Sequence, residues 1–229
     1  MMLALFIATL IIALSAQWQV KRMYRRFSQV PAESGITGAQ AAHQILWRAG
    51  IRDVEIIEQD EMLGDHYDPT RKRLVLSSAN YHGASLAALG VAAHEAGHAL
   101  QHRALYAPLR WRMAAVGVTT FASQAVAFLP LIGMATGLLS TMTGLTVMAA
   151  AWGVIMAFNL ITLPVEFDAS RRAKAALRQF GFISAQEHVS VAKVLNAAAL
   201  TYVAAFVTSL VYLLWYLLPL LTGGRQARS

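Results

Sequence analysis

The sequence contains no cysteine, and it has few charged residues for its length. The lack of cysteine excludes structural disulfides and thiolate metal sites, so any bound metal must be held by His, Asp or Glu. Charged residues make up 14% of the 229 residues, against roughly 25% in an average soluble domain. Hydrophobic residues make up 57%. So few charges would cover a soluble protein poorly, and the composition therefore predicts a membrane protein whose apolar faces contact lipid.

The central part of the chain lacks ionisable side chains altogether, with no Lys, Arg, Asp, Glu or His from Ala114 to Val165. This segment is too long for one transmembrane helix of about 20 residues and fits two, which we place near 114–133 and 143–163. Apolar runs at 1–20 and 200–222 raise the expected number of transmembrane helices to about four. A metal transporter is disfavoured, because such spans offer no obvious path for an ion.

The net charge of +7 is distributed as membrane topology requires. Positive charges follow the first apolar run, so we expect an uncleaved anchor with its N-terminus outside. Cleavage near Ser15 and Ala16 is the alternative. With four spans, every Lys and Arg except Arg225 and Arg228 lies on the cytoplasmic side. Basic residues beside apolar runs indicate a lipid bilayer as partner rather than nucleic acid, and we expect a protein of the cytoplasmic membrane.

Local signals predict several helix ends outside the bilayer. A helix should begin near Thr37 and end at Gly50, because Thr is a common N-cap and Gly a common residue after a helix. A second helix should occupy about 85–103. Ser184 followed by Glu187 forms a capping box, which should open the helix that leads into the last apolar run.

Two short segments, 54–58 and 73–77, have the composition of strands. Asp and Pro residues at 65–69 favour a turn between them, so we expect a β-hairpin. The second of these strands could offer its edge to an extended peptide. Pro164 should close the third span, because proline disfavours the helix interior.

The segment His94-Glu95-Ala96-Gly97-His98 carries the clearest chemistry in the chain. Histidines four residues apart project from one face of a helix, so both imidazoles can chelate one ion. Glu95 is offset by about 100° and can reach a water on that ion without being a ligand, which suits a general base. Ala96 and Gly97 are small and leave room for close packing of another element. Two satisfied core histidines are the alternative, which is disfavoured in a membrane protein with few histidines.

A catalytic zinc ion usually has three protein ligands and one open position. His102 lies at the next helical step, but such steps rise by about 6 Å, so one ion cannot easily meet three histidines. We expect His102 at the surface or beside a ligand. Candidates for the third ligand are Glu166, Asp168, Glu187 and His188. Glu166 stands at the cytoplasmic end of the third span, where a carboxylate could equally serve a helix N-terminus.

Five segments carry a resemblance to a known family, and they cover most of the chain from about residue 30 to 205: Asp65–Pro69, Tyr81–Gly83, Leu86–His102, Leu163–Arg172 and Val194–Val203. They resemble the YugP-type family of bacterial zinc-dependent membrane peptidases. The resemblance implies an integral-membrane metallopeptidase of the gluzincin kind, in which a Glu from a later helix completes the site of one Zn²⁺. Carried onto this sequence, that residue is Glu166.

A looser likeness connects the chain to the CAAX-prenyl-protease and HtpX families, in which the ligand Glu is followed four residues later by Asp. Ser170 stands at that position here, and Asp168 stands nearby. Asp168 could orient a ligand histidine, or it could pair with Arg171 or Arg172. Tyr202 could donate a hydrogen bond to a transition-state oxyanion, although an interfacial tyrosine is the commoner case.

Together these patterns predict a mostly α membrane protein with a small α+β metallopeptidase domain and about four transmembrane helices. The expected parts are an N-terminal anchor (1–20), a cytoplasmic zincin-like domain with the motif helix (28–112), a transmembrane hairpin (114–163), cytoplasmic helices carrying the third ligand (164–199) and a C-terminal transmembrane helix (200–222).

The expected function is that of a zinc endopeptidase with its site on the cytoplasmic side of the membrane. The apolar run before His94 has only eight residues, Leu86–Ala93, and is too short to span a bilayer. The motif helix should therefore lie at the membrane surface, and membrane-associated proteins or peptides are the expected substrates. The alternative is a non-catalytic metal-binding scaffold or partner subunit, against which the intact Glu95 argues.

Overall fold

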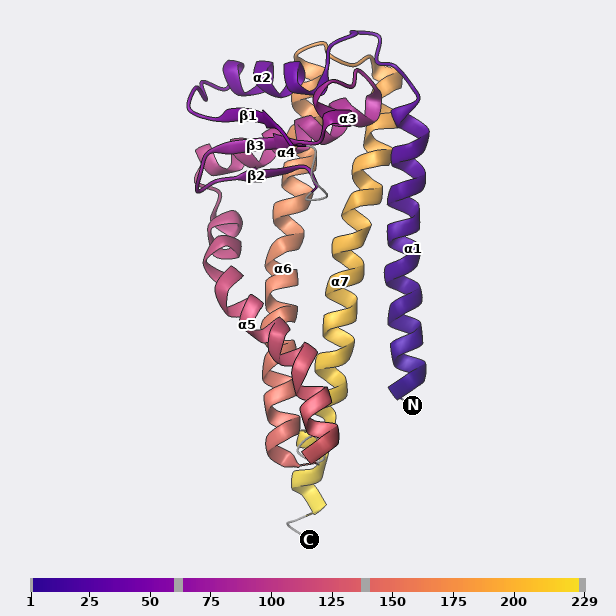
Figure 1. Ribbon diagram of the computed structural model, residues 1–229, viewed down its shortest axis with the longest axis vertical. Coiled ribbons are helices and arrows are strands. Elements are labelled where there is room, and N and C mark those ends of the chain that lie inside the picture. The colour runs from indigo at the N-terminus through magenta and orange to yellow at the C-terminus, as the bar shows by residue number, and fades with distance from the viewer. Residues whose placement is uncertain (1, 60–63, 137–140, 227–229) are drawn as a thin grey trace. The chain divides into compact units, whose positions relative to one another are not determined.

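A computed structural model describes residues 2–59, 64–136 and 141–226 (Figure 1). In chain order the elements are α1 (Met2–Ser28), α2 (Gly38–Arg48), β1 (Glu55–Glu58), β2 (His66–Asp68), β3 (Arg73–Leu76), α3 (Ser78–Tyr81), α4 (Leu86–Arg103), α5 (Ala107–Thr136), α6 (Met142–Gln179) and α7 (Ala185–Gln226). The expected fold class is confirmed. The described residues are mostly helical with one three-stranded sheet, and four helices (α1, α5, α6 and α7) are long and apolar enough to cross a membrane.

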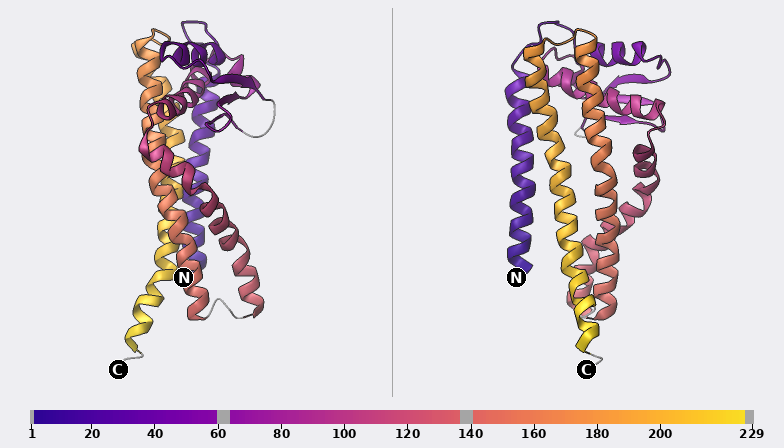
Figure 2. Two further views of the ribbon diagram at one scale, coloured as in Figure 1. Left: turned by 90° about the vertical axis from the view of Figure 1, so that its left-hand side faces the viewer. Right: turned by 180° about the vertical axis from the view of Figure 1, so that it is seen from behind.

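The chain divides into two compact units. Unit one contains residues 1–109 and 164–201, and unit two contains residues 110–163 and 202–229. Both α6 and α7 are single uninterrupted helices in every view (Figure 2), and each contributes residues to both units.

The sheet lies in unit one and has the strand order β1-β3-β2. The central strand β3 pairs in parallel with β1 and antiparallel with β2. The expected hairpin is therefore wrong, because part of the segment expected to be its turn forms β2. The turn comes slightly later, where the Asp68 carboxylate accepts from the backbone N–H groups of Thr70 and Arg71 at 2.8 and 3.0 Å. Strand β3 also has no free edge for a peptide, because both of its edges are paired.

The caps expected at Thr37 and Ser184 are confirmed. Thr37 and Gln40 form a reciprocal capping box at the start of α2, and the Ser85 hydroxyl caps α4. At the start of α7, the Glu187 carboxylate accepts from the backbone N–H of Ser184 at 2.7 Å, and the Ser184 hydroxyl accepts from the backbone N–H of Glu187 at 3.3 Å. These local hydrogen bonds fix where three helices of unit one begin.

The core of unit one is built around α4. Its buried Leu89 belongs to the same apolar cluster as Ile45 of α2, Leu74 of β3, Leu177 of α6 and Val191 of α7. Burial of each such side chain contributes roughly 1.5–3 kcal/mol relative to exposure. The helix carrying the two histidines is therefore held by packing against four other elements.

Pro164 does not close a helix, contrary to expectation. It lies inside α6, which continues to Gln179. A proline in a helix interior removes one backbone hydrogen bond and costs about 3 kcal/mol. The residues after it compensate, because Val165, Ala169 and Ala173 recur on one helix face and are all fully buried. Tertiary packing therefore holds the helix through the proline, and Glu166 is a mid-helix residue rather than a helix-starting one.

Within unit two, α6 and α7 pack through aromatic and polar contacts. Trp152 stacks on Tyr212 with ring centroids 4.6 Å apart, and Met148 and Tyr216 are buried in the same cluster. The Asn159 amide donates to the Ser209 hydroxyl at 3.0 Å and thereby joins the two helices. A polar side chain satisfied in this way is compatible with an apolar surrounding.

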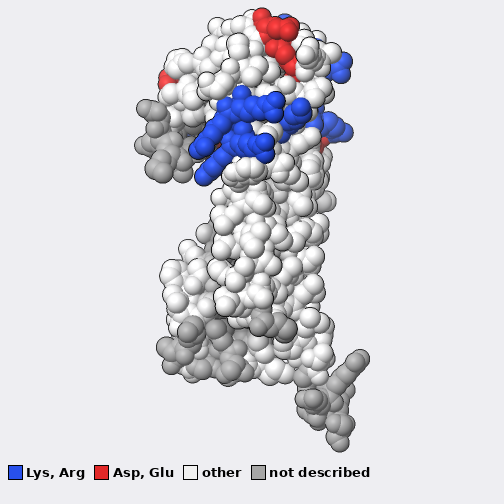
Figure 3. Space-filling model, turned by 90° about the vertical axis from the view of Figure 1, so that its right-hand side faces the viewer, with Lys and Arg blue, Asp and Glu red and all other residues white. Residues whose placement is uncertain are grey.

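Charged side chains are unevenly distributed over the surface. On the face shown in Figure 3, most of the visible Lys and Arg side chains gather in one cluster, Asp and Glu side chains lie near the top, and most of the remaining surface is uncharged. Along α1 an exposed apolar stretch is followed by four exposed cations: Lys21, Arg22, Arg25 and Arg26. This order suits a helix that leaves the bilayer at its C-terminal end.

Candidate metal centre

The two histidines of the motif project from α4 into the interior of unit one. Their rings lie edge to face, with centroids 4.8 Å apart. His98 is buried, and the His94 side chain is 15% exposed. The four-residue spacing therefore brings both rings together on one helix face, as expected from the sequence.

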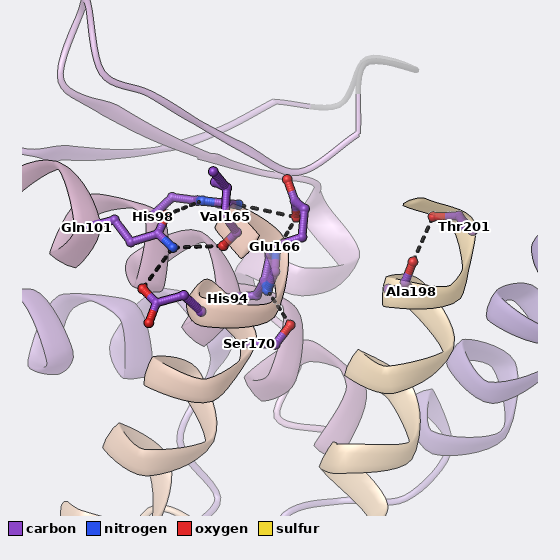
Figure 4. Close-up of polar contacts among 9 residues, drawn as sticks. His94, His98, Gln101, Val165, Glu166, Ser170, Ala198 and Thr201 are labelled. Atoms are coloured by element: carbon purple, nitrogen blue, oxygen red, sulfur yellow. Dashed lines mark hydrogen bonds and ion pairs between the residues drawn. The ribbon is translucent and has the colours of Figure 1, made fainter. Parts of the chain in front are cut away.

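Close contact between α4 and α6 brings the third group to the histidines. A Cβ atom added to Gly97 would lie 2.6 Å from the backbone oxygen of Ala169, nearer than real Cβ atoms approach. The two backbones therefore touch at a point that only glycine allows, and the expectation that Gly97 permits close packing is confirmed. Glu166 lies one helical turn before Ala169 on α6, so this contact places its carboxylate over the motif (Figure 4).

The Glu166 carboxylate faces both imidazoles. Its Oε2 atom lies 3.2 Å from Nε2 of His94 and 3.6 Å from Nε2 of His98, and the side chain is 2% exposed. Ligand atoms about 2.0–2.1 Å from a tetrahedral zinc ion are about 3.3 Å apart, so these separations suit one ion. Two imidazole nitrogens and one carboxylate oxygen are also a known zinc donor set. The group His94, His98 and Glu166 therefore fits a metal ion.

Glu95 is buried beside this group. Burial raises the pKa of its carboxyl above the ordinary value, although the nearby His94 and His98 oppose that effect. Burial alone would lower the pKa of His98, but the hydrogen bond and charge of Glu166 raise it overall. A carboxyl with a raised pKa next to a potential metal site is suited to accept a proton near neutral pH.

The outer nitrogens of both histidines have partners. Nδ1 of His94 lies 3.1 Å from the Ser170 hydroxyl, and Nδ1 of His98 lies 3.1 Å from the amide oxygen of Gln101 (Figure 4). Such contacts fix the orientation of a ligand ring. Ser170, four residues after Glu166, therefore supports the ring of His94. Gln101 was missed by sequence reasoning, because an isolated glutamine on a helix gives no signal of its partners.

Asp168 pairs with both arginines considered for it and also contacts Gln101. Its carboxylate pairs with Arg171 and, at 2.6 Å, with Nε of Arg172. It also accepts from the Gln101 amide nitrogen at 3.0 Å, so it reaches His98 only through Gln101. Orientation of a ligand histidine by Asp168 stays a prediction, and Gln101 is the residue through which it would act.

The other candidate residues lie outside the group. Nδ1 of His102 is hydrogen-bonded to the Tyr67 hydroxyl at 2.9 Å, and Glu187 caps α7. His188 lies on the first turns of α7. Tyr202 belongs to unit two, so its role in the transition state stays a prediction.

Comparisons with known proteins extend over nearly the whole chain. The family model described as "Putative neutral zinc metallopeptidase" matches residues 2–221. The chain is similar to the "Putative membrane protease YugP" of Bacillus subtilis (strain 168), with 45% identity over 219 residues that cover 96% of each protein. No solved structure matches the chain.

Proposed function

Because the chain belongs to the family described as "Putative neutral zinc metallopeptidase", we propose that it is a membrane endopeptidase whose single Zn²⁺ is held by His94, His98 and Glu166. The proposal rests chiefly on one observation. Three potential ligand atoms from two different helices lie within 4.8 Å of one another in a buried place, next to a buried carboxyl that is not one of them. A scaffold that only bound metal would have no use for that additional carboxyl.

The proposed mechanism assigns metal binding and proton transfer to different side chains. His94, His98 and Glu166 hold the ion, and a bound zinc ion supplies Lewis-acid chemistry that polarises a carbonyl and makes water reactive at neutral pH. Glu95 accepts the proton of the attacking water at its carboxylate and delivers it to the nitrogen of the departing amine. Its raised pKa makes this carboxylate a stronger base than an exposed one. The surrounding buried side chains limit the access of bulk water to the site.

We further propose that residues 28–112 and 164–199 face the cytoplasm, with the N-terminus outside, and that the substrates are membrane-associated proteins or peptides. The distribution of Lys and Arg supports the orientation, since basic residues concentrate in the segments between the spans. Liposomes containing the purified protein test the substrate class. A membrane-anchored peptide should be cleaved faster than the same peptide without its anchor, and the reverse preference would refute this part of the proposal.

Replacement of the base tests the enzymatic role. In cells producing Glu95→Gln in place of the wild type, protein N-termini generated in the membrane proteome should disappear while the zinc content of the purified protein is kept. Glu55→Gln is the matched control, because that side chain is 62% exposed. Unchanged cleavage by Glu95→Gln would refute the general-base role. No cleavage by the wild type, despite bound zinc, would favour a non-catalytic scaffold.

A further inference from the structure

Gln101 occupies an unusual position for an uncharged polar side chain. It is completely buried on α4, one helical turn after His98, and its amide contacts three groups. The amide nitrogen donates to the backbone oxygen of Val165 at 2.7 Å and to the Asp168 carboxylate at 3.0 Å. The amide oxygen lies 3.1 Å from Nδ1 of His98. Both ends of the amide are therefore used, and the side chain connects α4 to α6.

The partners of the amide nitrogen determine which way the amide points. The carbonyl oxygen of Val165 and the carboxylate of Asp168 can only accept hydrogen bonds, provided that Asp168 is ionised. Its pairing with Arg171 and Arg172 stabilises the ionised form. A flipped amide would direct its oxygen at two acceptors and leave a buried conflict that costs about 1–3 kcal/mol for each unsatisfied group. The amide oxygen must therefore face His98.

We infer that Gln101 is a positioning residue that selects the tautomer of His98. The amide oxygen can only accept and lies 3.1 Å from Nδ1, nearer than the 3.6 Å between the Glu166 carboxylate and Nε2, so it places the proton of neutral His98 on Nδ1. Nε2, which faces Glu166, then keeps its lone pair for a metal ion. Asp168 and its two arginines act on this histidine through Gln101, by holding the amide in one orientation. The inference rests on the proposed function, because it gives His98 the role of a ligand.

Ser170 provides an internal comparison. Its hydroxyl lies 3.1 Å from Nδ1 of His94, but a hydroxyl can either donate or accept. Ser170 therefore supports the ring of His94 without selecting its tautomer. The two histidines differ at Nδ1, where the Gln101 oxygen can only accept and the Ser170 hydroxyl can do either.

Zinc affinity measured against a chelator buffer tests the inference without any cleavage assay. Gln101→Met keeps similar volume and removes every hydrogen bond of the amide. We expect its zinc dissociation constant to rise about 10–100-fold, the usual effect of losing a partner of a ligand histidine. Ser170→Ala should have a smaller effect. In the double variant Gln101→Glu with Asp168→Asn, the donor and acceptor of the contact between these two side chains are exchanged while the hydrogen bond to Val165 stays lost, so affinity should recover in part relative to Gln101→Glu alone.

Histidine tautomers give a second readout that a purely structural role would not change. In zinc-free protein labelled with ¹⁵N at histidine, at a pH where His98 is neutral, Nδ1 should be the protonated nitrogen in the wild type. In Gln101→Met, the proton should shift towards Nε2. A wild-type proton on Nε2, or zinc affinity unchanged in Gln101→Met, would overturn the inference. A wild type that binds no zinc would instead refute the proposed function, while the tautomer could still be read.

Discussion

Substitution of Gly97 by Ala tests whether the contact between α4 and α6 builds the metal site. The added Cβ would lie 2.6 Å from the backbone oxygen of Ala169, whereas ordinary contacts begin at 3.4 Å. The two helices must therefore separate by about 0.8 Å, a distance that follows from these two values. Metal–ligand distances tolerate deviations of only about 0.2 Å. A shift of this size would draw Glu166 away from the two histidines.

The expected loss appears in zinc affinity more than in stability. Overpacking lowers the free energy of unfolding by about 1–3 kcal/mol. Replacing Gly by Ala inside a helix raises it by about 1 kcal/mol through helix propensity, so the net change should be small. The gain in helix propensity does not restore the positions of the zinc ligands, so zinc affinity is not compensated in this way. We expect the zinc dissociation constant of Gly97→Ala to rise at least about tenfold, equivalent to about 1.4 kcal/mol.

Competition with a chelator in detergent, with circular dichroism to verify the fold, measures this change. Gly90→Ala is the matched control. It lies on the same helix, gains the same helix propensity, and its new Cβ would meet only the Val191 side chain, at 3.3 Å. If Gly97→Ala bound zinc as tightly as Gly90→Ala, the reasoning that links helix contact to ligand geometry would be refuted.

Three further predictions follow from the same structure. Removal of zinc should lower the melting temperature of the protein, because free zinc at 100 times its dissociation constant stabilises a fold by about 2.7 kcal/mol. Equal melting temperatures with and without chelator would contradict this prediction. Burial, with smaller contributions from Asp53 and Asp68, raises the pKa of Tyr67 to about 12 from 10.0. The neutral phenol is thus favoured by folding, and its contribution to stability should be complete below pH 10 and lost between about pH 10 and 12. Between pH 9 and pH 11, the melting temperature of the wild type should therefore fall more than that of Tyr67→Phe. Equal falls in the two proteins would argue against the raised pKa of Tyr67. Because the chain has no cysteine, Arg71→Cys introduces a single thiol in an exposed turn. This thiol should react with a membrane-impermeant reagent only after the membrane is opened, and labelling in intact cells would contradict the proposed topology.

Features determined by short-range chemistry could be predicted from the sequence. The caps at Thr37, Ser85 and Ser184 depend on residues three positions away, and the spans depend on long apolar runs. The meeting of His94 with His98 likewise follows from helical periodicity.

Features determined by contacts distant in sequence could not be predicted. The parallel pairing of β1 with β3 and the continuation of α6 through Pro164 both depend on packing partners far along the chain. Gln101 is the clearest case, since its partners on α6 lie 64 and 67 residues away. Glu166 was assigned only through the family resemblance, because its position alone suited a helix terminus equally well.

Zinc binding by two proteins that differ only at Glu166 tests the central claim most directly. Wild type and Glu166→Ala are purified in the same detergent and equilibrated in a buffer that fixes the free zinc concentration, and their metal content is measured by mass spectrometry. We expect one zinc ion per wild-type chain and far less in Glu166→Ala at the same free zinc concentration. Equal zinc in the two proteins, or none in the wild type, would contradict a metal site shared between α4 and α6.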